Sequence, residues 1–127
     1  MLDFEADMDE LSNIGDNFVN LIYSLALSNA MKRPMGVKVS NYVLSEALLN
    51  SGFRDRAGKG LDKHDMADFV ESIIFFAWTE GKVTIDECVG ILTDNIEPTT
   101  DRYRLRRSSI AAFTELLKRI GDLIWTK

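Results

Sequence analysis

The stretch LSNIGDNFVNLIYSLALSNA, residues 11–30, decides the fold of this chain. Its apolar residues recur at intervals of about three to four positions, which is the spacing of one face of an α-helix. That face comprises Ile14, Phe18, Leu21, Ile22 and Leu25. Further apolar residues extend it around the side of the helix, namely Val19, Tyr23, Ala26 and Leu27. We therefore expect a long helix that is buried nearly all round.

A break and a second, shorter helix are expected next. Residues 32–36 read KRPMG, and both proline and glycine oppose continuation of a helix. Ser40 is placed to cap the second helix, which we expect to end near residues 51–52. Residues 53–63, FRDRAGKGLDK, are charged and glycine-rich and lack apolar periodicity. This segment is expected to form an exposed loop.

Three more helices complete the predicted fold. Asp62 or Asp65 can cap the third helix, whose apolar residues repeat at helical spacing. Thr84 opens a fourth helix, which we expect to end near residue 95. The last helix is expected to begin within residues 100–109. Because no stretch shows the alternation of a strand, the predicted fold class is all-α.

Length and composition are typical of one packed domain that spans residues 1–127. The chain has 127 residues, of which 46% are hydrophobic and 28% charged. No run reaches the roughly 18 apolar residues of a membrane-spanning helix, and the acidic N-terminus is unlike a signal peptide. We expect an intracellular, cytoplasmic protein with no membrane partner. Cys88 is the single cysteine, so it can form no internal disulfide and is expected to pack in the core.

Charge is unevenly distributed along the chain. The net charge of −5 does not by itself favour nucleic acid as a partner, and five of the first ten residues are acidic. Residues 101–107 nevertheless carry four arginines, which predicts a local basic face. These candidate phosphate contacts are Arg102, Arg104, Arg106 and Arg107. The alternative is that they cover a solvated helix start.

Two otherwise apolar helices are interrupted by acids. Asp16 lies within IGDNFV, and Asp68 and Glu71 lie within MADFVESIIFFAW. Asp68 and Glu71 are three residues apart, so they lie on one helical face. Each acid has an ordinary interpretation, as a cap or as part of a solvated face. Charges are seldom buried without a partner, however, so acids inside apolar runs indicate a functional site.

Clustered carboxylates of this kind favour a metal ion. Two like charges about 4 Å apart repel by roughly 4 kcal/mol at an effective dielectric near 20, unless a cation or a shared proton intervenes. Magnesium prefers oxygen ligands and keeps several waters. We predict a carboxylate Mg²⁺ site near these acids, with Mn²⁺ as an alternative. Asp9 lies on the same helical stripe as Asp16.

The two acidic stretches resemble the ribonuclease III family. Residues 9–19, DELSNIGDNFV, resemble its signature helix, approximately E-x-x-E-F-L-G-D-A-V-L, with Gly-Asp in register. Residues 67–78, ADFVESIIFFAW, are similar to its second acidic element, roughly A-D-x-x-E-A-L-I-G-A-I-Y, and the order of the two elements fits. The resemblance spans residues 9–95. A chain without a double-stranded-RNA-binding domain looks like the short archaeal members of the family or like Mini-ribonuclease III.

This resemblance implies a helical bundle like the ribonuclease III endonuclease domain. It implies a metal-dependent endoribonuclease that hydrolyses phosphodiesters of double-stranded or structured RNA to 5′-phosphate and 3′-hydroxyl ends. By the resemblance, Asp16 and Glu71 would be catalytic, and Asp16, Asp68 and Glu71 would hold the metal. The resemblance also implies a homodimer in which the signature helices meet. A helix central to a monomer is the alternative explanation for the apolar surface of residues 11–30.

One departure from the family pattern keeps other functions open. Ser12 stands where the family usually has a glutamate ligand, and serine is a poor replacement for a carboxylate on magnesium. Either Asp9 or a water fills the gap, or metal affinity and activity are reduced. The second hypothesis is therefore a catalytically weak or inactive RNA-binding or assembly module of the same fold. A third is a helical protein–protein adaptor.

Overall fold

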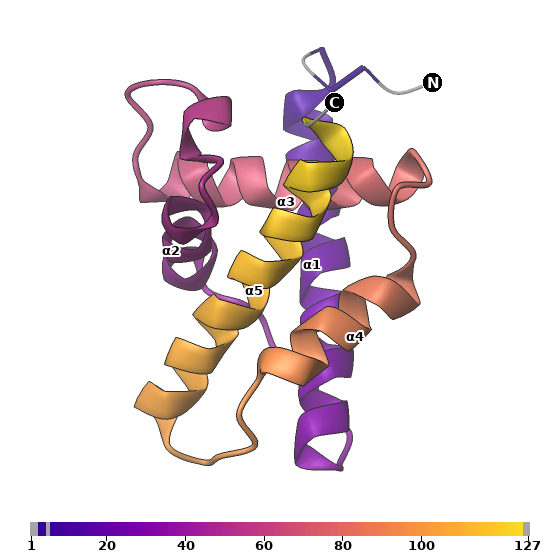
Figure 1. Cartoon of the computed structure of the whole chain (residues 1–127), viewed down its shortest axis with the longest axis vertical. Coiled ribbons are helices and arrows are strands. Elements are labelled where there is room, and N and C mark those ends of the chain that lie inside the picture. The colour runs from indigo at the N-terminus through magenta and orange to yellow at the C-terminus, as the bar shows by residue number, and fades with distance from the viewer. Residues whose placement is uncertain (1–2, 5, 126–127) are drawn as a thin grey trace.

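The protein is described by a computed structural model of residues 3–4 and 6–125. Within these residues it is all-α and contains no strand, as the sequence predicts (Figure 1). The helices are α1 (Met8–Met31), α2 (Asn41–Ser51), α3 (Lys63–Thr79), α4 (Ile85–Asn95) and α5 (Arg102–Ile124), and a short 3-10 helix, η1 (Arg54–Ala57), precedes α3. In this part of the chain no helix combines the length and the apolar character needed to cross a membrane.

The helices form a bundle in which one member runs crosswise. In Figure 1, α1, α4 and α5 run obliquely or along the long axis, whereas α3 lies across α1 near one end. α3 packs against α1 and α2, and α5 packs against α2 and α4. Buried apolar residues from all five α-helices form the core. Cys88 is among them, as predicted, and its burial raises the pKa of its thiol to about 12.

Side-chain caps explain where the helices begin. The Ser40 hydroxyl accepts a hydrogen bond from the Val43 amide at 3.2 Å, which confirms the predicted cap of α2. Asp62 caps α3, and Asp65 completes its capping box, so the two candidate residues act together. Thr84 opens α4 through a second capping box, also as predicted.

The predicted exposed loop at residues 53–63 is only partly correct. Residues 54–57 form η1, and Phe53 is half-buried. The Phe53 ring lies 5.2 Å from the Trp125 ring, centroid to centroid. A Cβ atom at Gly121 would meet the Phe53 ring at 2.1 Å, so this glycine makes room for the aromatic side chain. The sequence pattern missed this contact because its partners are far apart along the chain.

The prediction that α1 is buried nearly all round is wrong. Ile14, Leu21 and Leu25 are 49%, 48% and 41% exposed. Phe18 and Ile22, which the same apolar pattern includes, are buried. α3 and α4 cover one side of α1, so the opposite side retains an apolar stripe in contact with solvent. We call Ile14, Leu21 and Leu25 the α1 stripe.

α1 and α3 are in close backbone contact at Gly15. A Cβ atom at this position would lie 2.4 Å from the carbonyl oxygen of Glu71 and 2.7 Å from its carbonyl carbon. Both are backbone atoms of α3, so they cannot move aside by rotating a side chain. The absence of a side chain at Gly15 thus determines how close the two helices lie.

Gly15→Ala should therefore lower the free energy of unfolding by about 1–3 kcal/mol, because overpacking outweighs the better helix propensity of alanine. Gly90→Ala is the matched control, since Gly90 lies within α4 and a Cβ there would meet nothing within 4 Å. The control should raise stability by up to about 1 kcal/mol. Urea unfolding measures both values, and equal effects of the two substitutions would contradict the packing argument.

Candidate active site

The α1–α3 crossing brings the predicted acids together. Asp16 follows Gly15 directly, and Glu71 is the residue against which Gly15 packs. Glu71 is buried, with 5% of its surface exposed, whereas Asp16 and Asp68 are half-buried. The pKa of Glu71 is raised to about 8, first by burial, then by a hydrogen bond with Asp16 and by the negative charges of Asp16 and Asp68. Three acids that are up to 55 positions apart in sequence numbering thus interact at one place.

A cleft opens beside Asp68, and neither Asp16 nor Glu71 is among its lining residues. It has a volume of about 650 Å³ and is lined by residues from the first turns of α1, from the loop after η1 and from the beginning of α3. Asp9, Ser12, Asp65 and Asp68 are among its lining residues. Asp9 is exposed and shares the cleft with Asp68. From the sequence Asp65 is expected only as a helix cap, because a capping position explains an aspartate without any ligand.

The acids suit a magnesium ion that keeps most of its own water. Among the residues that the structure describes, no three or more His, Cys, Asp or Glu side chains form a group able to hold a metal. A magnesium site needs fewer protein ligands than such a group provides, because one or two carboxylates together with waters and phosphate oxygens complete the coordination of the ion. Asp16 and Glu71 meet that smaller requirement. A cation between them would also offset the burial of the Glu71 carboxylate and its repulsion by Asp16 and Asp68, which together raise its pKa.

Asn20 holds Asp16 in place from the next turn of α1. Its Nδ2 donates a hydrogen bond to Asp16 Oδ1 at 3.3 Å. Its Oδ1 accepts one from the Val39 amide at 2.9 Å, which orients the Asn20 side chain so that its NH₂ group faces Asp16. The sequence places Asn20 on the stripe of Asp16 but gives no sign of this role, because Val39 belongs to the connection between α1 and α2.

Asp68 also has a contact on its own helix. His64 Nε2 lies 3.5 Å from Asp68 Oδ2, one helical turn away. His64 Nδ1 lies 3.2 Å from Nδ2 of Asn41, at the start of α2. His64 is an exposed residue near the helix cap and at the same time a neighbour of a candidate ligand. Its contacts connect the acids to the beginning of α2.

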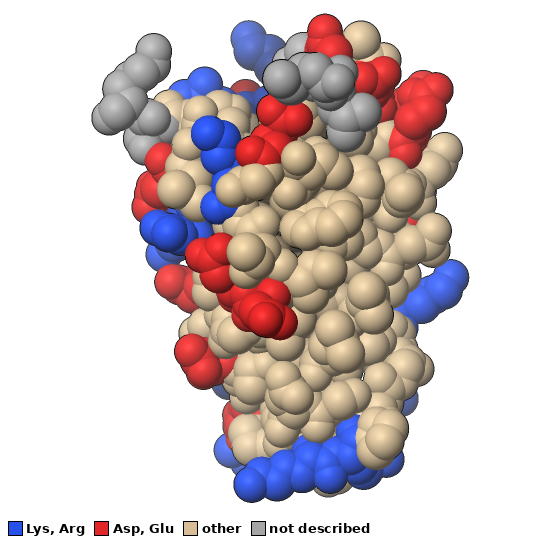
Figure 2. Space-filling view, turned by 90° about the vertical axis from the view of Figure 1, so that its right-hand side faces the viewer, with Lys and Arg blue, Asp and Glu red and all other residues tan. Residues whose placement is uncertain are grey.

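The four predicted RNA-binding arginines do not line the acidic cleft. They lie in the first turns of α5, at the end of the molecule away from α3 (Figure 1). Figure 2 shows Lys and Arg side chains gathered at that end, where α1 ends and α5 begins. Their surroundings differ: Arg104 forms an ion pair with Glu97, and Arg107 lies 5.6 Å from the centroid of the Tyr103 ring. Proximity along the sequence therefore does not make the four arginines equivalent.

Glu71 makes the stability of the metal-free protein depend on pH. Its pKa is 4.5 ordinarily and about 8 in the fold, so the folded state binds a proton that the unfolded chain releases between these values. Stability should therefore fall as pH rises from about 4.5 to 8. Glu71→Gln removes this pH-dependent loss of stability, because glutamine does not ionise. The substitution should raise Tm at pH above 8 by at least ~3 °C, with little change below pH 5.

Thermal unfolding in a chelator over this pH range measures the effect. Glu115→Gln is the control, since Glu115 is an exposed acid of α5, and its Tm should stay close to that of the wild type at every pH. A Tm difference between Glu71→Gln and the wild type that does not grow with pH would refute the assignment of a buried proton to Glu71.

Comparison with known proteins identifies the family of the chain. A model of the Ribonuclease III family matches residues 9–126. The match includes both acidic stretches and continues beyond residue 95, where the motif resemblance ends, to cover α5. A search of curated proteins found no match. Because the family model covers nearly the whole chain and the two acidic elements meet in the fold, the chain belongs to the ribonuclease III family of endoribonucleases, which are hydrolases.

Proposed function

We propose that this chain is a metal-dependent endoribonuclease that cuts double-stranded or structured RNA to 5′-phosphate and 3′-hydroxyl ends. The observation that carries the proposal is the contact between Asp16 and the buried Glu71, with the charge of Asp68 nearby. An acid pair this costly to bury is typical of a catalytic site and exceptional in a structural core. The adjacent cleft of about 650 Å³ offers room for a phosphate group.

The roles of the residues follow from their surroundings. Asp16 and Glu71 would hold Mg²⁺, or Mn²⁺ in its place, and Asp68 would bind its water shell from the cleft. When bound, the cation would supply Lewis-acid stabilisation of the phosphate and activation of water. Glu71 must release its proton for this, so metal binding should be weaker at low pH. Asn20 would keep Asp16 oriented through its two hydrogen bonds.

Asp9 is the proposed substitute for the missing glutamate. It lies one helical turn before Ser12, and both residues line the acidic cleft together with Asp68. A carboxylate at this position can bind a water of the metal without direct coordination. This arrangement would retain a negative charge on the side of the site where Ser12 offers none.

Incubation with long double-stranded RNA and Mg²⁺ tests the activity. Cleavage should fall at least ~100-fold in Asp16→Asn and in Glu71→Gln, because each loses charge needed to stabilise the reacting phosphate. Asp94→Asn, which changes an exposed acid of α4, should cleave like the wild type. Equal cleavage by all four proteins would point to a contaminating nuclease and refute the assignment of the site.

The serine at position 12 supports a second candidate, an RNA-binding or assembly module with little catalysis. The same long double-stranded RNA distinguishes this module from the active nuclease. Salt-sensitive binding without cleavage at any Mg²⁺ or Mn²⁺ concentration would favour the module, since phosphate contacts release counterions. Absence of both binding and cleavage at low salt would leave only the adaptor hypothesis.

We further propose that the chain forms a homodimer through the α1 stripe. Ile14, Leu21 and Leu25 face solvent along about 16 Å of α1, at 1.5 Å per residue. Trp78 lies at the edge of this surface, stacked on Phe18 at 5.1 Å and itself exposed. A two-fold axis would place the stripe of one copy against the same stripe of the other, burying both. The family resemblance implies the same arrangement.

Leu21→Glu should disrupt this dimer, because a charge would be buried without a partner. The dimer dissociation constant should rise at least ~10-fold, equivalent to about 1.4 kcal/mol. Leu49→Glu is the control, since Leu49 is also 48% exposed but lies on α2. Sedimentation velocity at micromolar concentration measures both. A monomeric wild type, or equal weakening by the two substitutions, would contradict the proposed interface.

A further inference from the structure

A second cavity, distinct from the acidic cleft, opens between the beginning of α5 and the residues that lead into α2. Its volume is about 380 Å³. Three basic residues line it, namely Lys38, Arg102 and Arg106, and none of the described acidic residues does. Tyr23 of α1 and Ser40, the cap of α2, also line it. We call this the basic cavity.

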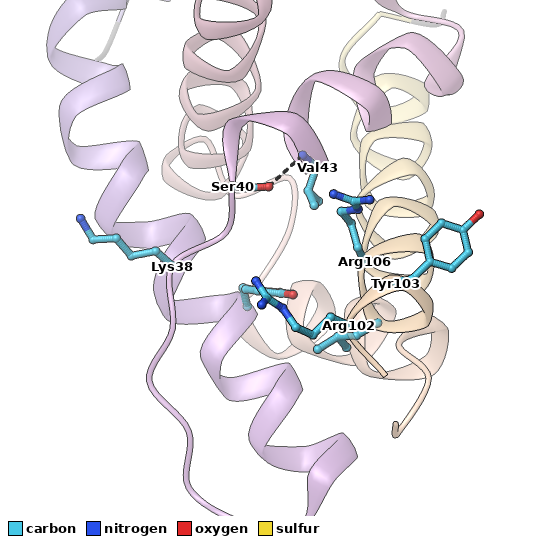
Figure 3. A pocket seen from close by; sticks show the side chains of 8 residues that line it. Lys38, Ser40, Val43, Arg102, Tyr103 and Arg106 are labelled. Carbon is cyan, nitrogen blue, oxygen red and sulfur yellow. Dashed lines mark hydrogen bonds between the residues drawn. The ribbon is translucent and has the colours of Figure 1, made fainter. Parts of the chain in front are cut away.

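Both arginines line the basic cavity from α5. They are four residues apart on α5, so they lie on one helical face. Figure 3 shows Arg106 beside Val43 at the beginning of α2, whereas Arg102 extends from the start of α5 toward α1. Lys38 comes from the opposite side, and its ammonium group points outward in this view. A flexible four-carbon side chain allows this ammonium to approach an anion in the cavity.

These cations are available to a ligand, in contrast to Arg104 on the same helix. Among the described residues, neither Lys38 nor Arg102 has an acidic partner, and the guanidinium of Arg106 lies 5.1 Å from the centroid of the Tyr42 ring. Arg104 is already paired with Glu97. The basic cavity thus holds a concentration of positive charge that the described part of the fold does not neutralise.

The basic cavity and the acidic site are joined through α1 and its following loop. Asn20, which donates to Asp16, accepts a hydrogen bond from Val39, and Val39 lies between the cavity residues Lys38 and Ser40. Along α1, the step from Asp16 to Tyr23 is seven residues, or about 10 Å. A ligand in the cavity is therefore close enough to be part of the same bound molecule as a phosphate at the acids.

Positive charge also continues from the cavity toward α3. Lys63 Nζ lies 4.9 Å from the centroid of the Tyr42 ring, the same ring that Arg106 contacts. Lys63 is the first residue of α3, and the next residue, His64, contacts Asp68. An anionic chain could follow this surface from the basic cavity to the acidic cleft.

We propose that the basic cavity binds a phosphate group of the RNA, held by Arg102 and Arg106 and supported by Lys38. This proposal rests on the proposed function, because it takes the RNA at the acidic site as the ligand. Guanidinium groups match phosphate oxygens through paired N–H donors, which makes arginine well suited to such a site. The phosphate is either a phosphodiester within a strand or a phosphomonoester at its 5′ end.

Binding of short RNA duplexes without metal tests the proposal. Fluorescence anisotropy in a chelator would compare the wild type with Arg102→Gln/Arg106→Gln, using one duplex that ends in 5′-phosphates and one that ends in 5′-hydroxyls. The double variant should bind at least ~5-fold more weakly, and the slope of log K against log salt should fall by about 1, because one phosphate contact is lost. If affinity falls for both duplexes, the phosphate bound in the basic cavity is a phosphodiester within a strand. If affinity falls only for the duplex with 5′-phosphates, it is the phosphomonoester at the strand end.

Arg104→Gln/Arg107→Gln is the matched control, with the same charge change on the same helix. It should keep at least half of the wild-type affinity and nearly the full salt slope. The proposal would be overturned if the two double variants lost RNA-binding affinity equally. It would also be overturned if Arg102→Gln/Arg106→Gln kept the wild-type affinity at an unchanged Tm. Cleavage assays in Mg²⁺ report separately on the proposed function, because Glu71→Gln should abolish cleavage and leave binding in the chelator intact.

Discussion

The fold and the candidate site both depend on the contact between the backbone of α1 at Gly15 and the Glu71 carbonyl of α3. Since a Cβ atom at Gly15 would meet that oxygen at 2.4 Å, any other residue would push the helices apart. The acid that follows Gly15 in α1 is Asp16, and the closely packed helices hold it against the Glu71 side chain. The same contact that packs the core thus produces an acid pair that is unfavourable without a proton or a cation.

The pair of Asp16 and Glu71 is connected to several neighbouring features of the molecule. The side-chain amide of Asn20 donates a hydrogen bond to Asp16 and accepts one from the backbone of Val39. The orientation of Asp16 is therefore coupled to the segment that leads into α2. The basic cavity begins at that same segment. Acidic and basic parts of the surface are therefore connected through covalent neighbours, although the protein as a whole is acidic. In such a protein, local placement of charge outweighs net charge in deciding which ligand can bind.

Prediction succeeded where a local interaction is sufficient. Ser40 and Thr84 cap their helices through partners three residues away, so a short sequence motif contains the whole interaction. Prediction failed where the partner lies elsewhere in the chain. Periodicity identified the apolar residues of α1 but could not tell that Leu21 faces solvent, because the packing of α3 and α4 decides which side of α1 is covered. Phe53 was assigned to an exposed loop for the same reason.

The sequence by itself determined the helical fold class, the helix boundaries and the two acidic elements of the ribonuclease III family, since propensity, capping and motif spacing are local properties. Only the tertiary structure decided that Asp16 and Glu71 interact, and that Arg102 and Arg106 line a cavity while Arg104 is neutralised by Glu97. The physical reason is that charge interactions depend on distance and burial in space, and neither is contained in the order of residues along the chain.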